Sequence, residues 1–183
     1  MLTVFFGVAC GLLGWTLLEF IIHYPLGHLP KGKTLISREH LQHHKDISYF
    51  SPLSKKLRGA VPVLAILGGG LIWLAGVPFG AGFIASIIAG WITYEWLHQS
   101  IHVNGPRSRY GRWAARHHLS HHFMRPNQNH GVTTPLWDLI LGTYQRYDVV
   151  RVRAQDVTEL PWLKRALDTQ GEKPAFVADY EVR

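Results

Sequence analysis

The sequence predicts an all-α integral membrane protein, a helical bundle with a cytoplasmic helical cap that carries clusters of histidine. Charge is strongly segregated, because residues 1–22 contain one charged residue, Glu19, and residues 59–94 contain none. The 183 residues suit one domain, and 12 of them are histidine, as many as Asp and Glu together. The 47% hydrophobic and 12% aromatic content excludes a disordered chain. The one cysteine, Cys10, excludes an internal disulfide framework.

Three membrane crossings are predicted. Residues 1–22 would form a helix of about 33 Å, enough to cross a bilayer core, and they lack the basic start and small-residue cleavage site of a signal peptide. The second apolar region is too long for one crossing, and the Gly-Val-Pro-Phe-Gly stretch at 76–80 predicts a turn within it. We therefore expect a hairpin of residues 61–75 and 81–97. Each arm is short for a full crossing, so a re-entrant hairpin is the alternative.

The positions of the cations predict the orientation. Lys and Arg concentrate in residues 31–58 and 107–125 and are absent from the N-terminus and the hairpin tip. By the positive-inside rule both basic segments face the cytoplasm, so three crossings place the N-terminus outside. The net charge of +7 then reflects topology and contact with the anionic lipid bilayer. No nucleic-acid-binding module is recognisable, so we expect no nucleic-acid partner.

The chain divides into a membrane-embedded domain, residues 1–148, and a C-terminal tail, residues 149–183. The tail has mixed charge and no histidine, and we interpret it as a cytosolic appendage. A helix is expected to begin there with Thr158 as its cap and Pro161 in its first turn.

The histidines form four local clusters. His98 and His102 are four residues apart, which places both on one face of a helix. Two further clusters repeat the spacing i, i+3, i+4, and a pair five residues apart follows the first span, whose helix we expect to end near Pro25 and Gly27. The predicted metal ligands are His23, His28, His40, His43, His44, His98, His102, His118, His121 and His122.

Ten imidazoles exceed the four to six ligands of one ion, so the spacing predicts a two-metal site. Imidazole suits zinc, copper, iron and nickel. A closed structural zinc site would need only four ligands, often cysteine, so the surplus favours a site with positions open for chemistry. Dications held by neutral ligands favour acidic neighbours, although Glu19 and Glu95 could instead be solvated at the interface. The candidates for additional ligands or for partners of the ligands are His117, His130, Glu19, Glu95 and Asp138, with Glu39 as a further acid.

The four histidine clusters resemble the histidine boxes of the fatty acid hydroxylase / sterol desaturase superfamily. The segment from Asn129 to Asp138, continued by Gly142-Thr143-Tyr144, is similar to the segment that follows that family's last box, and the resemblance covers residues 15–147. It implies a membrane enzyme whose domain, here residues 1–148, holds two non-haem irons at its cytoplasmic face and uses dioxygen as co-substrate. Spacing alone does not separate iron from zinc, which could substitute. His130 stands where the family commonly has an aromatic residue.

The resemblance implies a dioxygen-dependent lipid oxidoreductase. We favour hydroxylation of a fatty-acyl or related chain, with carotenoid ring hydroxylation and lipid desaturation as alternatives. The di-iron centre itself would be catalytic, with no separate protein acid or base assigned. No haem-binding sequence of the fused hydroxylases is present, so a separate ferredoxin or cytochrome is expected to supply electrons. From a different class, the chain could be a membrane metal-handling protein, but transport favours ionisable residues within the spans, and residues 59–94 have none. A haem-binding membrane anchor would leave most of the histidines unexplained.

Overall fold

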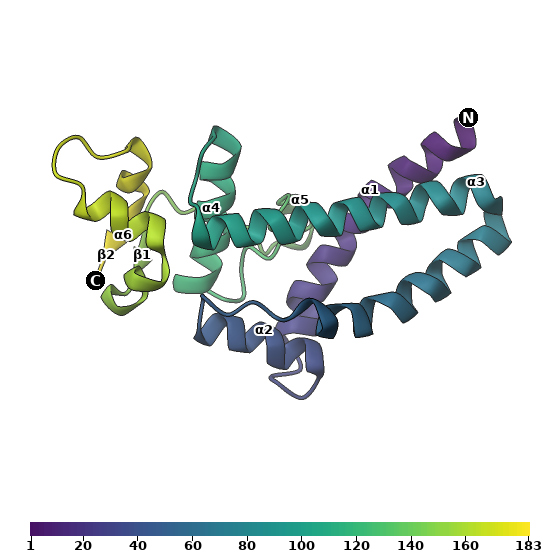
Figure 1. The fold of residues 1–183 in the computed structure, drawn as a ribbon, viewed down its shortest axis with the longest axis horizontal. Helices are drawn as coiled ribbons and strands as arrows, with labels where there is room; N and C mark the ends of the chain where they lie inside the picture. Colours follow the sequence, from purple (N-terminus) through teal and green to yellow (C-terminus); the bar gives the residue numbers. More distant parts are fainter. The chain divides into compact units, whose positions relative to one another are not determined.

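A computed structural model describes residues 1–183 and is mostly helical (Figure 1). The chain divides into two compact units. One comprises Met1–Glu19 with Ser51–Thr93, and the other comprises Phe20–Phe50 with Tyr94–Arg183. The elements in order are α1 (Leu2–Ile21), the π-helix η1 (Ile22–His28), α2 (Leu35–Lys45), α3 (Leu53–Val103), α4 (Arg109–Phe123), α5 (Leu136–Leu141), β1 (Val150–Val152), the 3₁₀-helix η2 (Ala154–Glu159), α6 (Pro161–Asp168), the 3₁₀-helix η3 (Ala175–Asp179) and β2 (Tyr180–Val182).

The first unit contains most of the apolar sequence. Helix α3 is interrupted at Gly76, whose φ of 82° lies in the left-handed region that glycine adopts without strain. Its two arms meet there in a sharp bend (Figure 1), at the start of the predicted turn. The second arm packs against α1 along small residues, which allow helix backbones to approach closely: a Cβ added to Gly82 would lie 2.7 Å from the Val4 carbonyl oxygen.

Two helical segments are long and apolar enough to cross a membrane, Leu2–His28 and Leu53–Val103. Large apolar side chains on the second are exposed, including Ile66, Trp73 and Leu74. Exposed apolar surface of this extent is typical of contact with lipid. The segments therefore suggest membrane association.

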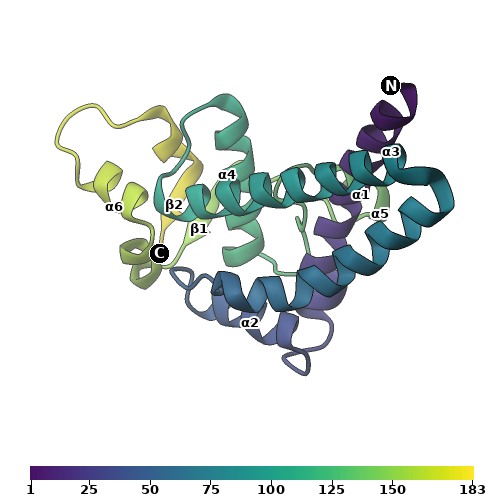
Figure 2. The same ribbon diagram turned by 45° about the vertical axis from the view of Figure 1, so that its right-hand side comes forward.

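The second unit has a hydrophobic core to which the C-terminal segment contributes half of the buried residues. Strand β1 lies beside α4 (Figure 2) and pairs in parallel with β2. The core residues are Ile47, Leu97, Ile101, Ala114, Ala115, Leu119, Val132, Val150, Val152, Val157, Leu160, Trp162, Leu163 and Tyr180.

Three details differ from the expectations for this region. The β1–β2 pair adds a small sheet to a fold predicted to be all-α. Residues 149–183 pack into the core rather than forming an appendage, because the alternating valines of β1 and one face of α6 are apolar and fully covered. Thr158 lies within η2, where its hydroxyl donates to the Gln155 carbonyl oxygen, so the predicted cap is wrong, whereas Pro161 does stand at the first position of α6.

Candidate metal centre

The ten histidines predicted as ligands lie in two groups of five within the second unit. In each group one ring nitrogen from every histidine lies within 4.8 Å of the corresponding nitrogens of the others. The first histidine group consists of His23, His28, His40, His44 and His121, and the second histidine group consists of His43, His98, His102, His118 and His122.

The local structure explains how each element serves its group. On α2, the i and i+4 residues His40 and His44 turn to the first group, and the i+3 residue His43 turns to the second. On α4 the same spacing sends His118 and His122 to the second group and His121 to the first. Each triplet therefore divides between the groups, since the i+3 side chain points to the other flank of the helix from the i and i+4 pair.

The pair at the end of the first span depends on an unusual helix. The chain does not leave the helix near Pro25 and Gly27, as expected, but continues to His28 as the π-helix η1. Hydrogen bonds in a π-helix join residues five apart, as between the Leu29 N–H and the Tyr24 carbonyl. Residues five apart such as His23 and His28 can therefore serve one group. Gly27 also lets α2 approach, because a Cβ there would lie 2.9 Å from the His40 ring.

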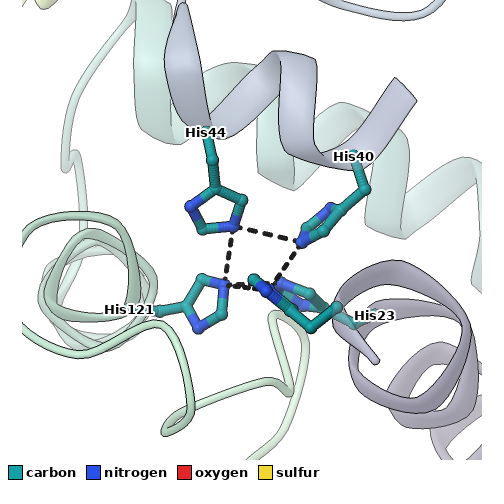
Figure 3. Close-up of side chains that lie close together, drawn as sticks. His23, His40, His44 and His121 are labelled. Carbon is teal, nitrogen blue, oxygen red and sulfur yellow. Dashed lines mark hydrogen bonds between the residues drawn. The ribbon is translucent and has the colours of Figure 1, made fainter. Parts of the chain in front are cut away.

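The ring nitrogens of the first group point toward one another (Figure 3). The Nε2 atom of His121 lies 2.9 Å from that of His23 and 2.9 Å from that of His44. The Nε2 atoms of His28 and His40 are 2.8 Å apart. Neighbouring ligands at right angles on one ion, each bound at about 2.1 Å, would be separated by about 3.0 Å, against about 3.4 Å in a tetrahedron. These separations fit several ligands of a single ion.

The hydrogen-bond partners of two of these rings indicate which ring nitrogens are available to bind a cation. The Nδ1 atoms of His23 and His121 lie 2.5 Å and 2.8 Å from the carbonyl oxygens of His130 and Gln128. A carbonyl accepts only, so each neutral ring carries its proton on Nδ1 and presents a lone pair at Nε2. Two lone pairs then face each other at 2.9 Å. A metal ion between them turns this repulsion into coordination, so the donor set fits an imidazole-binding transition metal.

The second group has the same inward arrangement. The Nε2 atom of His118 lies 3.0 Å from that of His102 and 3.0 Å from that of His122. The His43 Nδ1 atom donates to the Tyr49 carbonyl oxygen at 2.8 Å, which leaves its Nε2 for the group. The rings of His44 and His122 stack with centroids 4.3 Å apart, so the two groups are in direct contact.

Burial keeps these imidazoles neutral. It lowers the pKa of His118, His121 and His122 well below the ordinary value, and the neighbouring imidazoles lower it further. Burial and neighbouring histidines also lower the pKa of His44 to about 2. Neutral imidazole is the form that binds metal, so the groups need not lose protons to accept an ion at neutral pH.

Asp138, one of the predicted acids, holds the loop that supplies these carbonyls. Its fully buried carboxylate accepts from the backbone N–H groups of His130 and Gly131 at 2.8 and 2.7 Å and from the Thr143 hydroxyl at 2.6 Å. Burial alone would raise the pKa of the carboxyl group, but hydrogen bonds from His117, Thr143 and the backbone hold it below the ordinary value. Asp138 therefore remains an anion that fixes the His130 backbone.

Asn129 was not predicted and completes this loop. It is buried with a φ of 59°, a conformation that Asn adopts more readily than most residues. Its side-chain amide donates to Ser120 Oγ and the Gln145 carbonyl, and its side-chain oxygen accepts from the Gln145 N–H. Asn129 begins the segment that resembles the family, but nothing in the sequence assigns it a role, which its backbone conformation and hydrogen bonds reveal.

The other predicted partners lie outside the two groups. The His117 ring stacks between Trp113 and Tyr144 and contacts Asp138 at 3.3 Å. The His130 ring stacks on Tyr24, so its backbone carbonyl rather than its ring serves the first group. Glu19 and Glu95 belong to neither group. Glu39 accepts from the Tyr49 hydroxyl at 2.6 Å, and Tyr49 in turn accepts from His43.

The C-terminal segment connects the three helices of the second group. Glu159 accepts from the Ile47 N–H at 3.3 Å, just beyond α2. The Trp162 indole donates to the Ile101 carbonyl at 2.9 Å, next to His102 on α3. Asp179 pairs with Arg112 on α4 through two contacts of 2.5 and 2.7 Å. The segment thus contacts α3 and α4 and the residues that follow α2.

Comparisons with known proteins agree with this geometry. The family described as Fatty acid hydroxylase matches residues 8–143. Over 146 residues the chain is 29% identical to a dihydroceramide fatty acyl 2-hydroxylase of Arabidopsis thaliana, covering 74% of this chain and 59% of that protein. It is 28% identical over 159 residues to a fatty acid 2-hydroxylase of Rattus norvegicus, covering 77% and 40%, and 26% identical over 144 residues to a ceramide very long chain fatty acid hydroxylase of Saccharomyces cerevisiae, covering 73% and 36%.

The matches span about three fifths or less of the length of these relatives. No solved structure is significantly similar to the chain. The segment beyond residue 143, including the contacts to Ile47, Ile101 and Arg112, lies outside the family match.

Proposed function

The chain belongs to the fatty acid hydroxylase family, and on that basis we propose that it hydroxylates the acyl chain of a membrane lipid at a pair of histidine-held irons. The observation that carries the proposal is the convergence of ten imidazoles into two adjoining groups of five. The named relatives are 2-hydroxylases of fatty acids and of dihydroceramide acyl chains. We extend that regiochemistry to this chain, so that carbon 2 is the site of oxygen insertion.

The protein's contribution is to hold and shield the centre. The ten histidines would bind the ions as neutral ligands, and five per group leave one position free in a six-coordinate site. Two irons bound there would supply dioxygen activation and the removal of hydrogen from an unactivated carbon. The loop carbonyls of Gln128 and His130 keep the Nδ1 protons of their ligands in place, and burial of the rings limits access by bulk water.

The membrane arrangement belongs to the same proposal. The two apolar segments would embed the chain in the bilayer, with the bend at Gly76 dividing the second into two crossings. The N-terminus would be outside and the histidine groups and C-terminus cytoplasmic, since the basic segments flank the histidines. On that side a separate ferredoxin or cytochrome would deliver the two electrons that each turnover requires.

Lipid analysis tests the proposal. A host that expresses the chain is supplied with heavy dioxygen, and its lipids are compared by mass spectrometry with those of a His121→Ala strain. We expect an acyl lipid one oxygen heavier, labelled from dioxygen and absent from the variant. A product two hydrogens lighter would establish a desaturase instead. Zinc alone in the purified protein, together with unchanged lipids and altered metal tolerance of the host, would contradict the enzyme assignment.

A further inference from the structure

A cavity of about 350 Å³ opens onto both histidine groups. His28 and His44 of the first group and His122 of the second line it. A cavity that contacts ligands of both groups is a natural place for the part of a substrate that reacts. Its volume lies within the usual range of small-molecule sites, about 300–1,000 Å³.

The rest of the wall combines apolar side chains with one cation. Leu41, Phe123 and Pro126 supply the apolar surface, and Arg153 supplies the charge. Asp156, which is buried, holds the Arg153 guanidinium through Nε at 2.5 Å and Nη2 at 3.0 Å. This two-point contact fixes the plane of the guanidinium and leaves Nη1 for another acceptor. The Arg153 side chain is 61% exposed, so a ligand can reach it.

The chemistry of a 2-hydroxylation makes this combination informative. The carbon that is oxidised is bonded directly to the carbonyl carbon, so the polar end of the substrate must lie beside the ligands when carbon 2 reacts. The open pocket of about 350 Å³ has about twice the volume of a closed cavity that holds one benzene ring. That is enough for the polar end and the first carbons of an acyl chain, and too little for a whole long chain.

We propose that this cavity binds the carbonyl end of the acyl substrate, with Arg153 donating to the oxygen on carbon 1. The proposal rests on the proposed function and adds the substrate class and the residue that selects the position of hydroxylation. The shared chemistry is an oxygen acceptor on carbon 1, either the carboxylate of a free fatty acid or the amide carbonyl of an acylated amino lipid. Arg153 lies beyond residue 143, so it is not part of the family match.

Binding to the metal-loaded full-length protein in detergent tests the assignment. The probes are dodecanoic acid, an N-dodecanoyl amino lipid and dodecane, which lacks the carbonyl. We expect Arg153→Gln to weaken binding of at least one carbonyl probe about tenfold, the usual effect of losing a hydrogen bond from a charged donor, and to leave dodecane unchanged. Arg153→Lys should restore part of the affinity. The matched control is Arg151→Gln, two residues earlier, whose side chain is paired with Glu181.

The outcomes separate the two proposals. A loss confined to the acid identifies a free fatty acid as the ligand, and a loss confined to the amide identifies an amide-linked lipid. Unchanged binding of both carbonyl probes, or an equal loss with dodecane, overturns the role of Arg153. The lipid profile and the metal content of the wild-type protein are read separately, so an intact Arg153 effect together with zinc alone, unchanged lipids and altered metal tolerance would refute the catalytic proposal and leave the binding site standing.

Discussion

The two histidine groups are made from similar helices but are held in different ways. In the first group, backbone carbonyls of residues 128 and 130 accept from the Nδ1 atoms of His121 and His23. In the second group, His43 Nδ1 also donates to a carbonyl, that of Tyr49, but the Nδ1 atoms of His102, His118 and His122 are buried without a hydrogen-bond partner. Helix α3, which contributes histidines to the second group alone, is instead held by packing and by the Trp162 indole of the C-terminal segment.

The difference shows two ways to pre-organise a metal site. A hydrogen bond to Nδ1 fixes both the tautomer and the orientation of a ring, whereas packing fixes the helix and leaves the ring less constrained. A buried N–H without a partner costs about 1–3 kcal/mol. The first group should therefore bind its ion more tightly, and the second should depend more on the core around it.

The largest effect is expected from removing one ligand from each group. His121→Ala and His118→Ala should each reduce the bound metal from two ions per chain toward one and abolish hydroxylation, by about 10³-fold or more if both ions are needed for one reaction. Metal analysis of the purified proteins and lipid profiling measure the two results. Exposed Trp73→Phe is a control that should retain both ions. Two ions in both histidine variants would contradict the assignment of ligands.

The loop that braces the first group gives the next effect. Asp138→Asn replaces a carboxylate that accepts several hydrogen bonds with an amide. The NH₂ group of that amide cannot accept a hydrogen bond from the His130 or Gly131 N–H. Loss of such an outer contact typically reduces metal affinity about 10–100-fold. In competition with a chelator, the variant should release the ion of the first group more readily, while the metal affinity of the second group changes little.

A milder variant keeps that test interpretable if Asp138→Asn folds poorly. Thr143→Val removes one donor to the carboxylate and leaves its charge in place, so its effect should have the same sign and be smaller. Asp148→Asn, at a highly exposed acid, is the matched control. Equal loss from both groups in Thr143→Val would show that the loop does not act on the first group selectively.

The C-terminal segment offers the opposite test. Trp162→Phe keeps an aromatic ring in the core but removes the donor to the Ile101 carbonyl, which costs about 1–2 kcal/mol for a buried acceptor. We expect the second group to lose affinity about fivefold or more and the first group to change little. Chelator titration measures both. A loss of metal affinity in the first group alone would refute the division of roles between the Asp138 loop and the C-terminal segment.

Much of the site follows from the sequence because helical spacing is a strong constraint. The triplets at 40–44 and 118–122 and the pairs at 23–28 and 98–102 contain the ten residues that the structure brings together. The division of each triplet between groups was not predicted, although a rotation of about 100° per residue separates the i+3 side chain from the i and i+4 pair. The π-helix at 22–28 was also missed, because Pro and Gly usually end a helix.

The supports of the site could not be predicted in the same way. A backbone carbonyl such as that of Gln128 has no side-chain signature, since every residue carries one. The packing of the C-terminal segment was not predicted because its apolar runs are short and lie between charged residues. These runs are the valines of β1 and one face of α6. Local patterns identify ligands, but the contacts that orient them join segments far apart in the chain.

The smallest effect concerns protons in the metal-free protein. Burial lowers the pKa of His44 to about 2 and that of His122 well below the ordinary value of 6.5. The unfolded chain therefore binds protons below pH 6.5 that the folded chain does not, and the free energy of unfolding falls as the pH is lowered below 6.5 and is constant with respect to these groups above it. At pH 6 each such histidine contributes about 0.8 kcal/mol to this loss.

His44→Gln in the first group and His122→Gln in the second should each reduce the pH dependence of the free energy of unfolding by about that amount. Denaturant unfolding in detergent with chelator measures it. Because the lowering is caused first by burial, which the groups share, the two variants should agree here although they differ in metal affinity. An unchanged pH dependence in either variant would mean that its ring already carries a proton in the folded protein and is not ready to bind metal.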